Sequence, residues 1–216
     1  MLRFLKRHKD LLFFGLFLIL TTFYFVSQQY AGPRHMIHAP LDDKIPFLPG
    51  FIVPYCVWFV YIPALMLYMC FTDPRRFRRQ VLTLFSGAYF CGLIFLLYPS
   101  AIDFRPTPQG RDLFSALCRL IYASDRPVNV FPSLHCYEAL AIHLSTFHGD
   151  FGRRHPVLRA GSLVLVIAIC LSTVFVKQHS AADLAAGCGL AVGISALVRA
   201  FERRKQSRRA LRGEHS

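Results

Sequence analysis

The chain has few acidic residues and no cysteine pair of the kind that holds zinc. Its 216 residues include 12 Asp and Glu against 25 Lys and Arg, which gives a formal net charge of +13. Its seven cysteines form no Cys-x-x-Cys pair, so their spacing argues against a zinc site. Most of them lie in apolar stretches, where a cysteine acts as a small buried hydrophobic residue.

Other arrangements that carry chemistry are also missing. His135 and Glu138 lie one helical turn apart, but the further Glu residues and Glu-x-x-His motifs of a carboxylate di-iron bundle are absent. No glycine-rich nucleophile elbow surrounds Ser133, which argues against a serine hydrolase. We therefore expect no metal and no cofactor. The basic tail is not interleaved with aromatic residues, so we expect no nucleic-acid partner.

What the chain has is long stretches without charge. Hydrophobic residues make up 54% of the sequence and gather in six runs, which predict membrane-spanning helices. The first run follows a basic segment, as in a signal peptide, but no small-residue cleavage site comes after it, so we count it as a span. The six predicted spans lie at about 11–26, 51–71, 81–98, 132–147, 160–176 and 181–201.

The segments between these runs complete the predicted fold. Prolines and glycines break any helix in residues 31–50, and residues 99–131 form a long connection with a short helix at about 112–123. The chain contains no internal repeat and no low-complexity segment. We therefore predict a single all-α domain over residues 1–216, a six-helix transmembrane bundle with a short extra helix in the outward-facing loop.

The basic residues indicate which way the bundle faces. They gather in the N-terminal segment, in predicted turns at 73–79 and 149–159, and in a tail at about 202–216. Cytoplasmic loops carry the excess of Lys and Arg, so both termini and the tail are predicted to be cytoplasmic. The 99–131 connection, the start of the fourth span and the junction of the fifth and sixth spans then face the other side. The predicted location is a bacterial plasma membrane.

Three polar clusters fall on that non-cytoplasmic face. They occupy residues 103–106, 129–135 and 172–183. Charged groups at a membrane boundary are costly unless they are solvated or paired, which marks these clusters as candidate functional sites.

One of these clusters contains a histidine suited to nucleophilic catalysis. His179 and Asp183 lie four residues apart, which places them on one face of a helix. A carboxylate that accepts a hydrogen bond from one imidazole nitrogen fixes the tautomer and leaves the other nitrogen free to attack. His135 is a candidate general acid for a departing alkoxide. A structural His–Asp pair at a helix start is the alternative interpretation.

Cations and donors for a phosphate lie in the same clusters. Phosphoryl transfer depends on positioning and on positive charge around the equatorial oxygens, which Arg105 and Lys177 would supply. Pro132 suits the first turn of a helix, whose unpaired N–H groups bind anions, and Ser133 adds a hydroxyl. The candidate phosphate-binding residues are therefore Arg105, Ser133 and Lys177.

Together these residues resemble the signature of the type 2 phosphatidic acid phosphatase superfamily, the lipid phosphatases related to vanadium haloperoxidases. Its three blocks are Lys with Arg-Pro seven residues later, Pro-Ser-Gly-His, and Ser-Arg followed by a spaced His and Asp. Arg105-Pro106 matches the end of the first block. The segment from Pro132 to His135 matches the second, with Leu for Gly. Ser172, His179 and Asp183 match the third at the family's spacing.

The resemblance implies a role for each matched residue. His179 would form a phosphohistidine, Asp183 would orient it and His135 would be the acid, while Arg105 and Ser133 would bind phosphate. It also implies six membrane helices and no metal cofactor. The active site would lie on the non-cytoplasmic face.

Two positions depart from the family pattern. Tyr98 stands where the family has its first-block Lys, and Thr173 stands where it has its third-block Arg. Lys177 is the candidate replacement for one of these cations. The Pro-Ser-Leu-His motif together with Lys177-Gln178-His179 is most similar to the branch that includes inositol phosphorylceramide synthases, and that branch contains transferases as well as hydrolases.

The sequence thus predicts a metal-independent membrane phosphatase that hydrolyses a lipid or isoprenoid phosphate through a phosphohistidine. Its partners would be that substrate and the membrane lipids. A phosphotransferase that moves a polar headgroup of the inositol phosphate type between lipids is the first alternative. A non-catalytic membrane scaffold or lipid carrier is the second, and the presence of both His135 and His179 argues against it. The exact lipid and the oligomeric state stay open.

Overall fold

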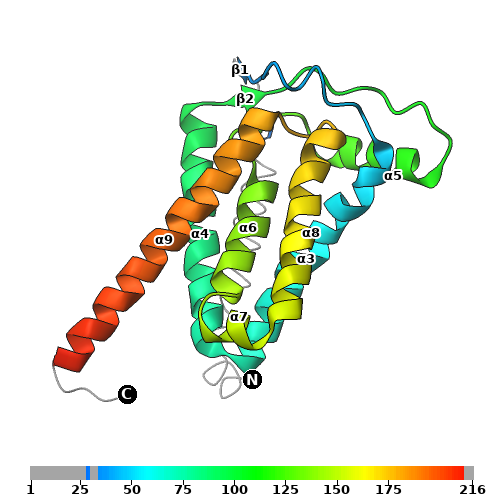
Figure 1. Cartoon of the computed structure of the whole chain (residues 1–216). Helices are drawn as coiled ribbons and strands as arrows, with labels where there is room; N and C mark the ends of the chain where they lie inside the picture. Colours follow the sequence, from blue (N-terminus) through cyan, green and yellow to red (C-terminus); the bar gives the residue numbers. More distant parts are fainter. Residues whose placement is uncertain (1–27, 30–33, 212–216) are drawn as a thin grey trace, which may run out of the picture.

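The structure is a computed structural model, and it describes residues 28–29 and 34–211. The predicted first span, at about 11–26, lies outside the described residues. Within them the chain is mostly helical, and two short strands pair at one end of the helices (Figure 1). The elements are β1 (His35–Met36), the 3-10 turn η2 (Pro49–Phe51), α3 (Ile52–Thr72), α4 (Pro74–Leu97), β2 (Ser100–Ala101), α5 (Leu113–Ser124), α6 (Leu134–Thr146), α7 (Asp150–Arg154), α8 (Pro156–Phe175) and α9 (Ala181–Leu211).

Four of the described helices are long and apolar enough to cross a membrane. They are α3 with η2, α4, α8 and α9. Large apolar side chains on their outer faces are exposed, such as Val60, Tyr89 and Val164, each about two-thirds exposed. Exposed apolar surface on this scale marks contact with lipid or with another protein. Four apolar helices with exposed apolar faces indicate a membrane protein.

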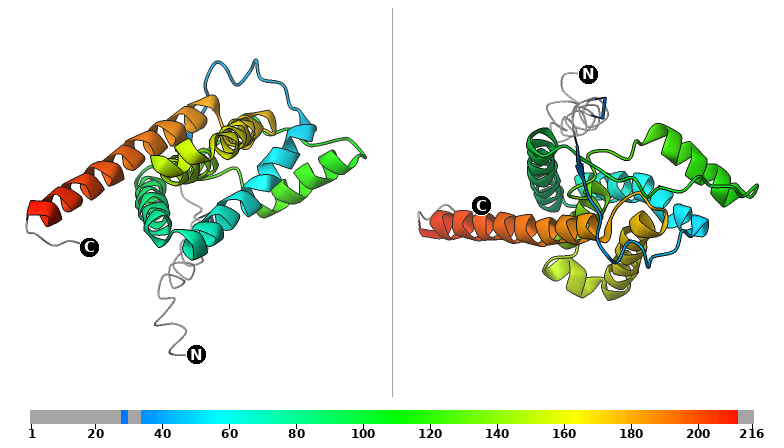
Figure 2. Two further views of the ribbon diagram at one scale, coloured as in Figure 1. Left: turned by 60° about the horizontal axis from the view of Figure 1, so that its bottom comes forward. Right: turned by 90° about the horizontal axis from the view of Figure 1, so that it is seen from above.

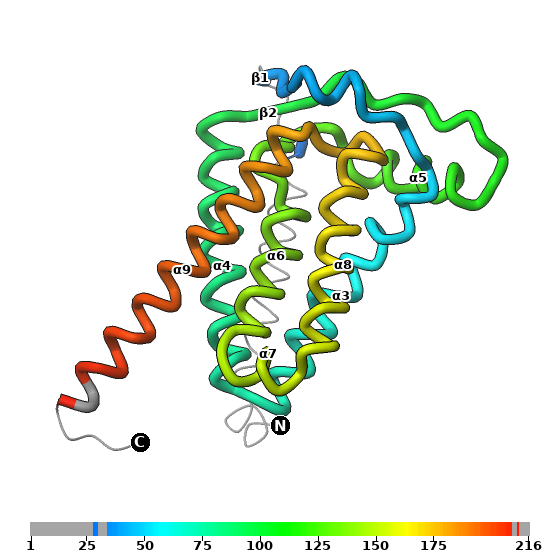
Figure 3. The backbone as a smooth tube through the Cα atoms, viewed as in Figure 1, coloured from blue at the N-terminus to red at the C-terminus, as the bar shows by residue number. Residues whose placement is uncertain are grey.

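The fourth predicted span is the short helix α6, and it does not have the length of a span. Its 13 residues rise about 1.5 Å each, so the helix covers about 20 Å of a hydrocarbon core that is about 30 Å thick. It lies in the middle of the bundle and packs against α3, α4, α8 and α9 (Figure 3). Cys136, Tyr137 and Ile142 are completely buried. The apolar run at 132–147 thus reflects burial in protein.

Two predicted turns are largely helical. Residues 73–79 were expected as a turn, but α4 begins at Pro74, and the carboxylate of Asp73 accepts a hydrogen bond from the N–H of Arg76 at 3.1 Å. An acidic N-cap followed by proline is a helix start, and the arginines after it are good helix formers. The turn expected at 149–159 likewise contains α7 and the beginning of α8.

The basic tail expected from about residue 202 continues α9 as helix as far as Leu211. Figure 2 shows α9 extending well beyond the other helices. Its outer part is tied to α4 by Arg79, whose Nε lies 2.7 Å from the Glu202 carboxylate. Lys, Arg, Gln and Glu all favour helix, so positive charge did not end the element.

The connections at the other end of the bundle form a layer over the helix ends. β1 pairs with β2 in parallel, with His35 beside Ser100, and Ala101 bridges to Val128. The short helix predicted in the long connection is confirmed as α5, which starts after Asp112, its N-cap. Two chain segments, residues 34–50 and residues 99–131, therefore cover the ends of α6 and α9 (Figure 1).

Candidate active site

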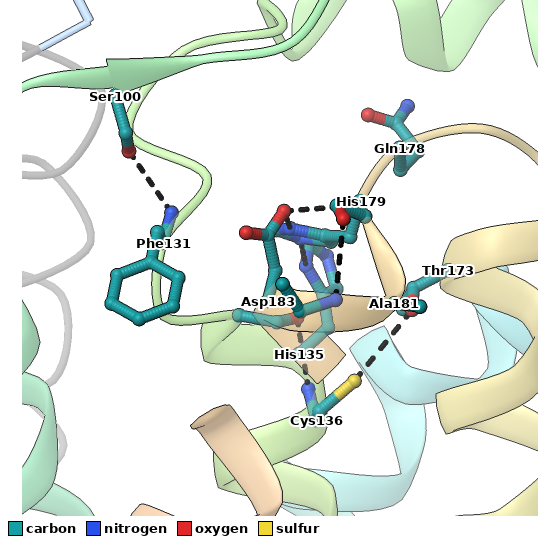
Figure 4. Close-up of polar contacts among 12 residues, drawn as sticks. Ser100, Phe131, His135, Cys136, Thr173, Gln178, His179, Ala181 and Asp183 are labelled. Atoms are coloured by element: carbon teal, nitrogen blue, oxygen red, sulfur yellow. Dashed lines mark hydrogen bonds and ion pairs between the residues drawn. The ribbon is translucent and has the colours of Figure 1, made fainter. Parts of the chain in front are cut away.

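The first turns of α6 and α9 meet beneath this layer. The N–H of Ser133 donates to the carbonyl of Asp183 at 3.1 Å, which joins the two helix starts. Gly187, one turn further along α9, permits this approach, because a Cβ there would overlap the carbonyl oxygen of Ser133. Residues about 50 positions apart in the sequence thus lie side by side, as Figure 4 shows for His135 and Asp183.

Each helix start is capped by a serine. The hydroxyl of Ser133 accepts from the N–H of Cys136 at 3.4 Å, and this bond leaves its O–H as a donor. At the start of α9, the hydroxyl of Ser180 accepts from Ala182 at 3.2 Å while the Asp183 carboxylate accepts from the Ser180 N–H at 2.9 Å. The two bonds resemble a capping box, but the serine caps the N–H of Ala182 and not that of Asp183.

The structure brings His179, Asp183 and His135 together in one row. His179 Nδ1 lies 3.4 Å from Asp183 Oδ2, and His179 Nε2 lies 3.4 Å from His135 Nδ1. His179 stands in the turn before α9, not on the helix as the spacing suggested. All three side chains are buried, with Asp183 completely so. The three residues to which the sequence analysis gave catalytic roles therefore lie within contact distance of one another.

Both contacts of His179 are long. The Nδ1–Asp183 contact satisfies the distance of an ion pair, but it does not have the geometry of a hydrogen bond. The second carboxylate oxygen, Asp183 Oδ1, is also buried without a hydrogen-bond partner among the described residues. Catalytic hydrogen bonds are often long before substrate binds and shorten in the complex. The row is therefore a site whose polar groups are close together but not yet saturated.

The ring of His135 lies between two aromatic side chains of α3. Its centroid is 4.6 Å from that of Tyr55 and 4.5 Å from that of Trp58. The hydroxyl of Tyr55 donates to a carboxylate oxygen of Asp125 at 3.2 Å. Tyr55 and Trp58 were not predicted from the sequence, because an aromatic residue in an apolar run looks the same whether it faces lipid or a site. These rings restrict the orientation of His135.

Arg105 reaches the site through the residue before His179. Its guanidinium donates to the carbonyl of Asp125 at 2.8 Å and to the side-chain oxygen of Gln178, and it stacks over the ring of Tyr122 at 4.5 Å. The side-chain nitrogen of Gln178 is buried without a hydrogen-bond partner in the part of the chain described. The predicted cation of the first motif is thus held beside the third motif.

Lys177 is placed differently from what the sequence predicted. Its Nζ donates to the carbonyl of Asp42 at 2.7 Å and to the carbonyl of Ile45 at 2.6 Å. The same nitrogen lies 5.5 Å from the centroid of the Phe104 ring. Two of the three N–H donors of the ammonium therefore bind the 34–50 segment. The ammonium was predicted to bind phosphate oxygens, but its two hydrogen bonds go to backbone carbonyl oxygens.

The backbone is strained shortly before the segment from Pro132 to His135 and shortly before His179. Asn129 has φ 55° and Lys177 has φ 52°, in the left-handed region that costs a residue with a side chain about 1–3 kcal/mol. Asparagine tolerates this conformation better than lysine does. Each residue directs the chain into a motif, since Asn129 precedes Pro132-Ser133 and Lys177 precedes His179. Strain of this kind persists where the surrounding contacts hold it, and it is frequent at functional sites.

The positions that depart from the family pattern are used for packing and for backbone contacts. Tyr98 stacks on His35, with ring centroids 3.9 Å apart. The carbonyl of Thr173 accepts from the N–H groups of Gln178, at 2.9 Å, and His179, at 3.1 Å, so this residue shapes the turn that carries His179. Ser172, which matches the family motif, donates its hydroxyl to Ile169 on its own helix at 2.6 Å.

One carboxylate at the site was not predicted from the sequence. Asp42, in the proline-rich segment, is 3% exposed. Its oxygens accept from the hydroxyl of Ser180 at 2.5 Å and from the N–H groups of Ala181, at 2.8 Å, and Ala39, at 2.7 Å. Burial acts to raise its pKa, but the hydrogen bonds from Ala181 and Ser180 outweigh burial, so the pKa lies below its ordinary value. Nothing near Asp42 in the sequence distinguishes it from a solvated loop residue.

Metal ligands do not gather at this site. Within residues 28–29 and 34–211, no three His, Cys, Asp or Glu side chains are placed so that they could hold a metal ion together. The pairing of His135 with Glu138 on a metal therefore gains no third ligand.

Comparisons with known proteins give no further evidence. The chain matches no protein-family model, no curated protein and no solved structure. Its function must be argued from the motifs and from the geometry described above.

Proposed function

We propose that the chain is a membrane-embedded phosphatase that hydrolyses a lipid or isoprenoid phosphate ester through a phosphohistidine at His179. Its motifs place it, on this proposal, in the type 2 phosphatidic acid phosphatase superfamily. The observation that carries the proposal is the row formed by Asp183, His179 and His135, with 3.4 Å between each pair of nearest atoms. Two histidines and one carboxylate in this order are what a nucleophile, its orienting group and a general acid require.

In the proposed mechanism His179 Nε2 attacks the phosphorus while the bond from phosphorus to the leaving oxygen breaks. Asp183 faces Nδ1, so it keeps the proton there and stabilises the charge that develops on the ring. His135 gives its proton to the leaving alkoxide. Water then attacks the phosphohistidine and gives a proton back to His135, and inorganic phosphate and neutral His179 are released.

Substrate must change the distance between the two histidines. In an in-line displacement the attacking nitrogen and the leaving oxygen lie on opposite sides of the phosphorus. His135 Nδ1 is 3.4 Å from His179 Nε2, which leaves no room for a phosphoryl group between them. The rings therefore separate when substrate enters, and the row describes the site at rest.

The phosphate would be bound by groups around this row. Arg105 is held beside His179 by Gln178 and presents a planar set of donors suited to two phosphate oxygens. Ser133 offers its O–H, and the first turn of α6 offers backbone N–H groups. Lys177 was predicted to join this set, but the proposal leaves it out, because two of its three N–H donors bind the carbonyls of Asp42 and Ile45. No metal ion takes part in this mechanism.

The site lies at one end of the four candidate spans, next to the layer formed by residues 34–50 and 99–131. We propose that this end faces the non-cytoplasmic side of a bacterial plasma membrane and that both termini are cytoplasmic. The basic segments of α4, α7 and α9 then lie on the cytoplasmic side, as the positive-inside rule expects. The run at 11–26 and the buried α6 would complete the six helices of the superfamily.

One observation favours a transferase as the second candidate. His135 and His179 are each 6% exposed, and Ser133 and Asp183 are completely buried. An enzyme that passes a phosphoryl or headgroup phosphate to an acceptor alcohol must keep water from the covalent intermediate. A closed site of this kind suits transfer between two lipids, because the lipid acceptor would enter from the membrane.

The test is phosphate release by purified protein in detergent with EDTA present. Phosphatidic acid, phosphatidylglycerol phosphate and undecaprenyl pyrophosphate are supplied in turn to the unmodified chain, to His179→Ala and to His155→Ala. His155 is an exposed histidine at the opposite end of α8 and is the matched control. We expect release by the unmodified chain and by His155→Ala only, with labelled phosphate trapped on His179 after brief exposure.

The other outcomes are equally informative. Release only after an acceptor alcohol such as inositol or diacylglycerol is added would favour the transferase. Activity of His179→Ala close to that of the unmodified chain would overturn the mechanism. No turnover and no trapped phosphohistidine under any of these conditions would overturn the proposed function.

A further inference from the structure

We propose that Asp42 is a positioning residue of the active site and that Asp42 and Lys177 together form a clasp that fixes the turn carrying His179. The clasp joins residues 39–48, here called the strap, to residues 175–181. This inference rests on the proposed function where it concerns turnover. The geometry of the clasp itself does not depend on the reaction.

Asp42 caps α9 from a distant part of the chain. Its Oδ1 accepts from the N–H of Ala181, the first residue of α9, at 2.8 Å. Its Oδ2 accepts from the hydroxyl of Ser180, the residue after His179, at 2.5 Å, and from the N–H of Ala39 at 2.7 Å. The first N–H groups of a helix have no partner within the helix, so a carboxylate placed there stabilises its start. The strap supplies that carboxylate to the helix start beside His179.

The three donors explain why residue 42 is an aspartate. Each carboxylate oxygen faces one backbone N–H, which cannot turn round to become an acceptor. An asparagine has one oxygen and one NH2 group, so one of its ends would direct N–H toward N–H. Only an ionised carboxylate satisfies both sides at once. The contacts of residue 42 therefore require the negative charge of an aspartate and not only its shape.

Lys177 grips the strap from the other side of His179. Its ammonium donates to the carbonyls of Asp42 and Ile45, at 2.7 and 2.6 Å. A further bond, from the N–H of Leu48 to the carbonyl of Phe175 at 2.9 Å, ties the end of the strap to the end of α8. The turn with His179 is thus held on both sides, by Lys177 before it and by Ser180 and Ala181 after it.

The clasp acts on a residue whose own side chain is weakly held. His179 has 3.4 Å contacts to Asp183 and to His135. Contacts of that length restrict a ring little, so the backbone on either side sets where the nucleophile points. The left-handed φ of Lys177 belongs to that backbone, and it persists only because neighbouring contacts hold it. The positions of Nδ1 and Nε2 therefore depend on the strap.

The experiment compares neighbouring residues of the same type. Asp42→Asn is paired with Asp43→Asn, because Asp43 is exposed and, within the part of the chain that the structure describes, its carboxylate contacts only His38, at 2.9 Å. Lys177→Met is paired with Lys44→Met, because Lys44 is exposed on the strap. Ser180→Ala removes one bond of the clasp, together with the bond from the N–H of Ala182 to the same hydroxyl, and serves if Asp42→Asn does not fold. Each variant is checked for folding by gel filtration in detergent.

The first readout is turnover of whichever lipid phosphate the unmodified chain cleaves. For Asp42→Asn and Lys177→Met we expect kcat to fall by about tenfold to a hundredfold, since a small misplacement of a catalytic group has effects of this size. KM should stay within about twofold of its original value, because the phosphate-binding groups are not altered. Ser180→Ala should lose several-fold, and the Asp43 and Lys44 variants should match the unmodified chain. A rise in KM with unchanged kcat for Lys177→Met would make it a phosphate ligand and overturn its place in the clasp.

The second readout does not need activity. His179 is 6% exposed, so diethyl pyrocarbonate should modify it slowly, as followed by mass spectrometry of its peptide. Loss of the clasp should raise that rate by about tenfold through local opening, while Asp43→Asn should not change it. If the unmodified chain has no activity but Asp42→Asn exposes His179, the clasp holds and only the proposed function fails. Wild-type kcat and wild-type modification rate in Asp42→Asn, or in Ser180→Ala if that variant is needed, would overturn the clasp.

Discussion

The two ends of the bundle hold buried histidines in different ways. At the end with the candidate site, His179 is 6% exposed and both of its polar contacts are 3.4 Å long. At the other end of α6, His143 is 5% exposed, and its Nδ1 lies 2.8 Å from the hydroxyl of Ser162. That hydroxyl is in turn 2.6 Å from the hydroxyl of Tyr61. Equal burial thus accompanies a short chain of hydrogen bonds in one place and loose contacts in the other.

This difference separates structural polar groups from reactive ones. A buried polar group that only supports the fold is stabilised by being fully paired. A group that must bind substrate keeps part of its bonding capacity unused, and local rules of good packing are broken there at some cost to stability. His143 follows the first pattern and His179 follows the second. Substitutions at matched residues of the two ends should therefore have different effects.

The largest difference is expected between His179→Ala and His143→Ala. Removing the proposed nucleophile should lower turnover by at least about a thousandfold, because the proposed covalent step is lost, and should alter thermal stability little. His143→Ala should keep turnover within about threefold but lower the stability by roughly 1–3 kcal/mol, because a buried hydrogen-bond partner of Ser162 is removed. Turnover assays and thermal melts in detergent on the same preparations measure both. Similar losses of turnover in the two variants would contradict the comparison.

Two aspartates at helix starts give the next largest difference. Asp183→Asn should lower kcat by about 10²- to 10⁴-fold, because an amide favours the wrong tautomer of His179. Asp73→Asn, at the start of α4 on the opposite end, should leave kcat within about twofold, since asparagine also caps helices well. Steady-state kinetics on both proteins decide the point. A full-activity Asp183→Asn would show that the carboxylate does not orient the nucleophile.

The sequence predicted correctly those helices whose ends coincide with changes in composition. The predicted spans at 51–71 and 160–176 correspond closely to α3 and α8, and the short helix at 112–123 corresponds to α5. The lengths of α4 and α9 were wrong at their basic ends, because arginine and lysine mark the limit of a membrane core but not the limit of a helix. The apolar run of α6 is surrounded by other helices of the protein, and composition alone does not distinguish such surroundings from lipid.

The residues of the candidate site likewise fall into those that could be predicted from the sequence and those that could not. His179 and Asp183 were paired from spacing because they are near neighbours in the chain. Tyr55, Trp58 and Asp42 lie at the site through long-range packing, which no local pattern records. The role of Lys177 shows the limit most clearly. Its charge suggested a phosphate ligand, but the partners of its ammonium come from a segment more than 130 residues earlier.

A smaller difference is expected between two arginines. Arg105→Lys should raise KM by about tenfold, because lysine cannot present paired donors to a phosphate or bridge Asp125 and Gln178 in the same way. Arg79→Lys should not alter KM, and its ion pair with Glu202 contributes at most about 1 kcal/mol, so stability should change little. Kinetics at varied substrate concentration test the first part, and melts test the second. An unchanged KM in Arg105→Lys would remove Arg105 from the phosphate-binding set.

The smallest effect is on acid stability, and it concerns Asp42 and Asp150. The pKa of Asp42 is lowered despite burial, which acts to raise it; the lowering comes from Ala181 and Ser180, with smaller contributions from Ala39 and His38. The pKa of exposed Asp150, at the opposite end, is lowered by hydrogen bonding and charge interaction with Arg153. An aspartate with a lowered folded-state pKa stabilises the protein fully above its unfolded pKa.

For Asp42 that contribution is complete well above pH 3.8, shrinks as the unfolded state takes up a proton near that value, and disappears below the lower folded pKa. Thermal melts from pH 6 down to pH 3 should therefore show a steeper loss for the unmodified chain than for Asp42→Asn. Added salt should change this difference little, because the donors to the Asp42 carboxylate are neutral N–H and O–H groups, and Lys177 is bonded to its backbone carbonyl. For Asp150→Asn the corresponding difference should shrink in 0.5 M salt, about five times the ionic strength at which the screening length is about 10 Å. Parallel slopes for the unmodified chain and Asp42→Asn would mean that residue 42 is not held as a carboxylate at the start of α9.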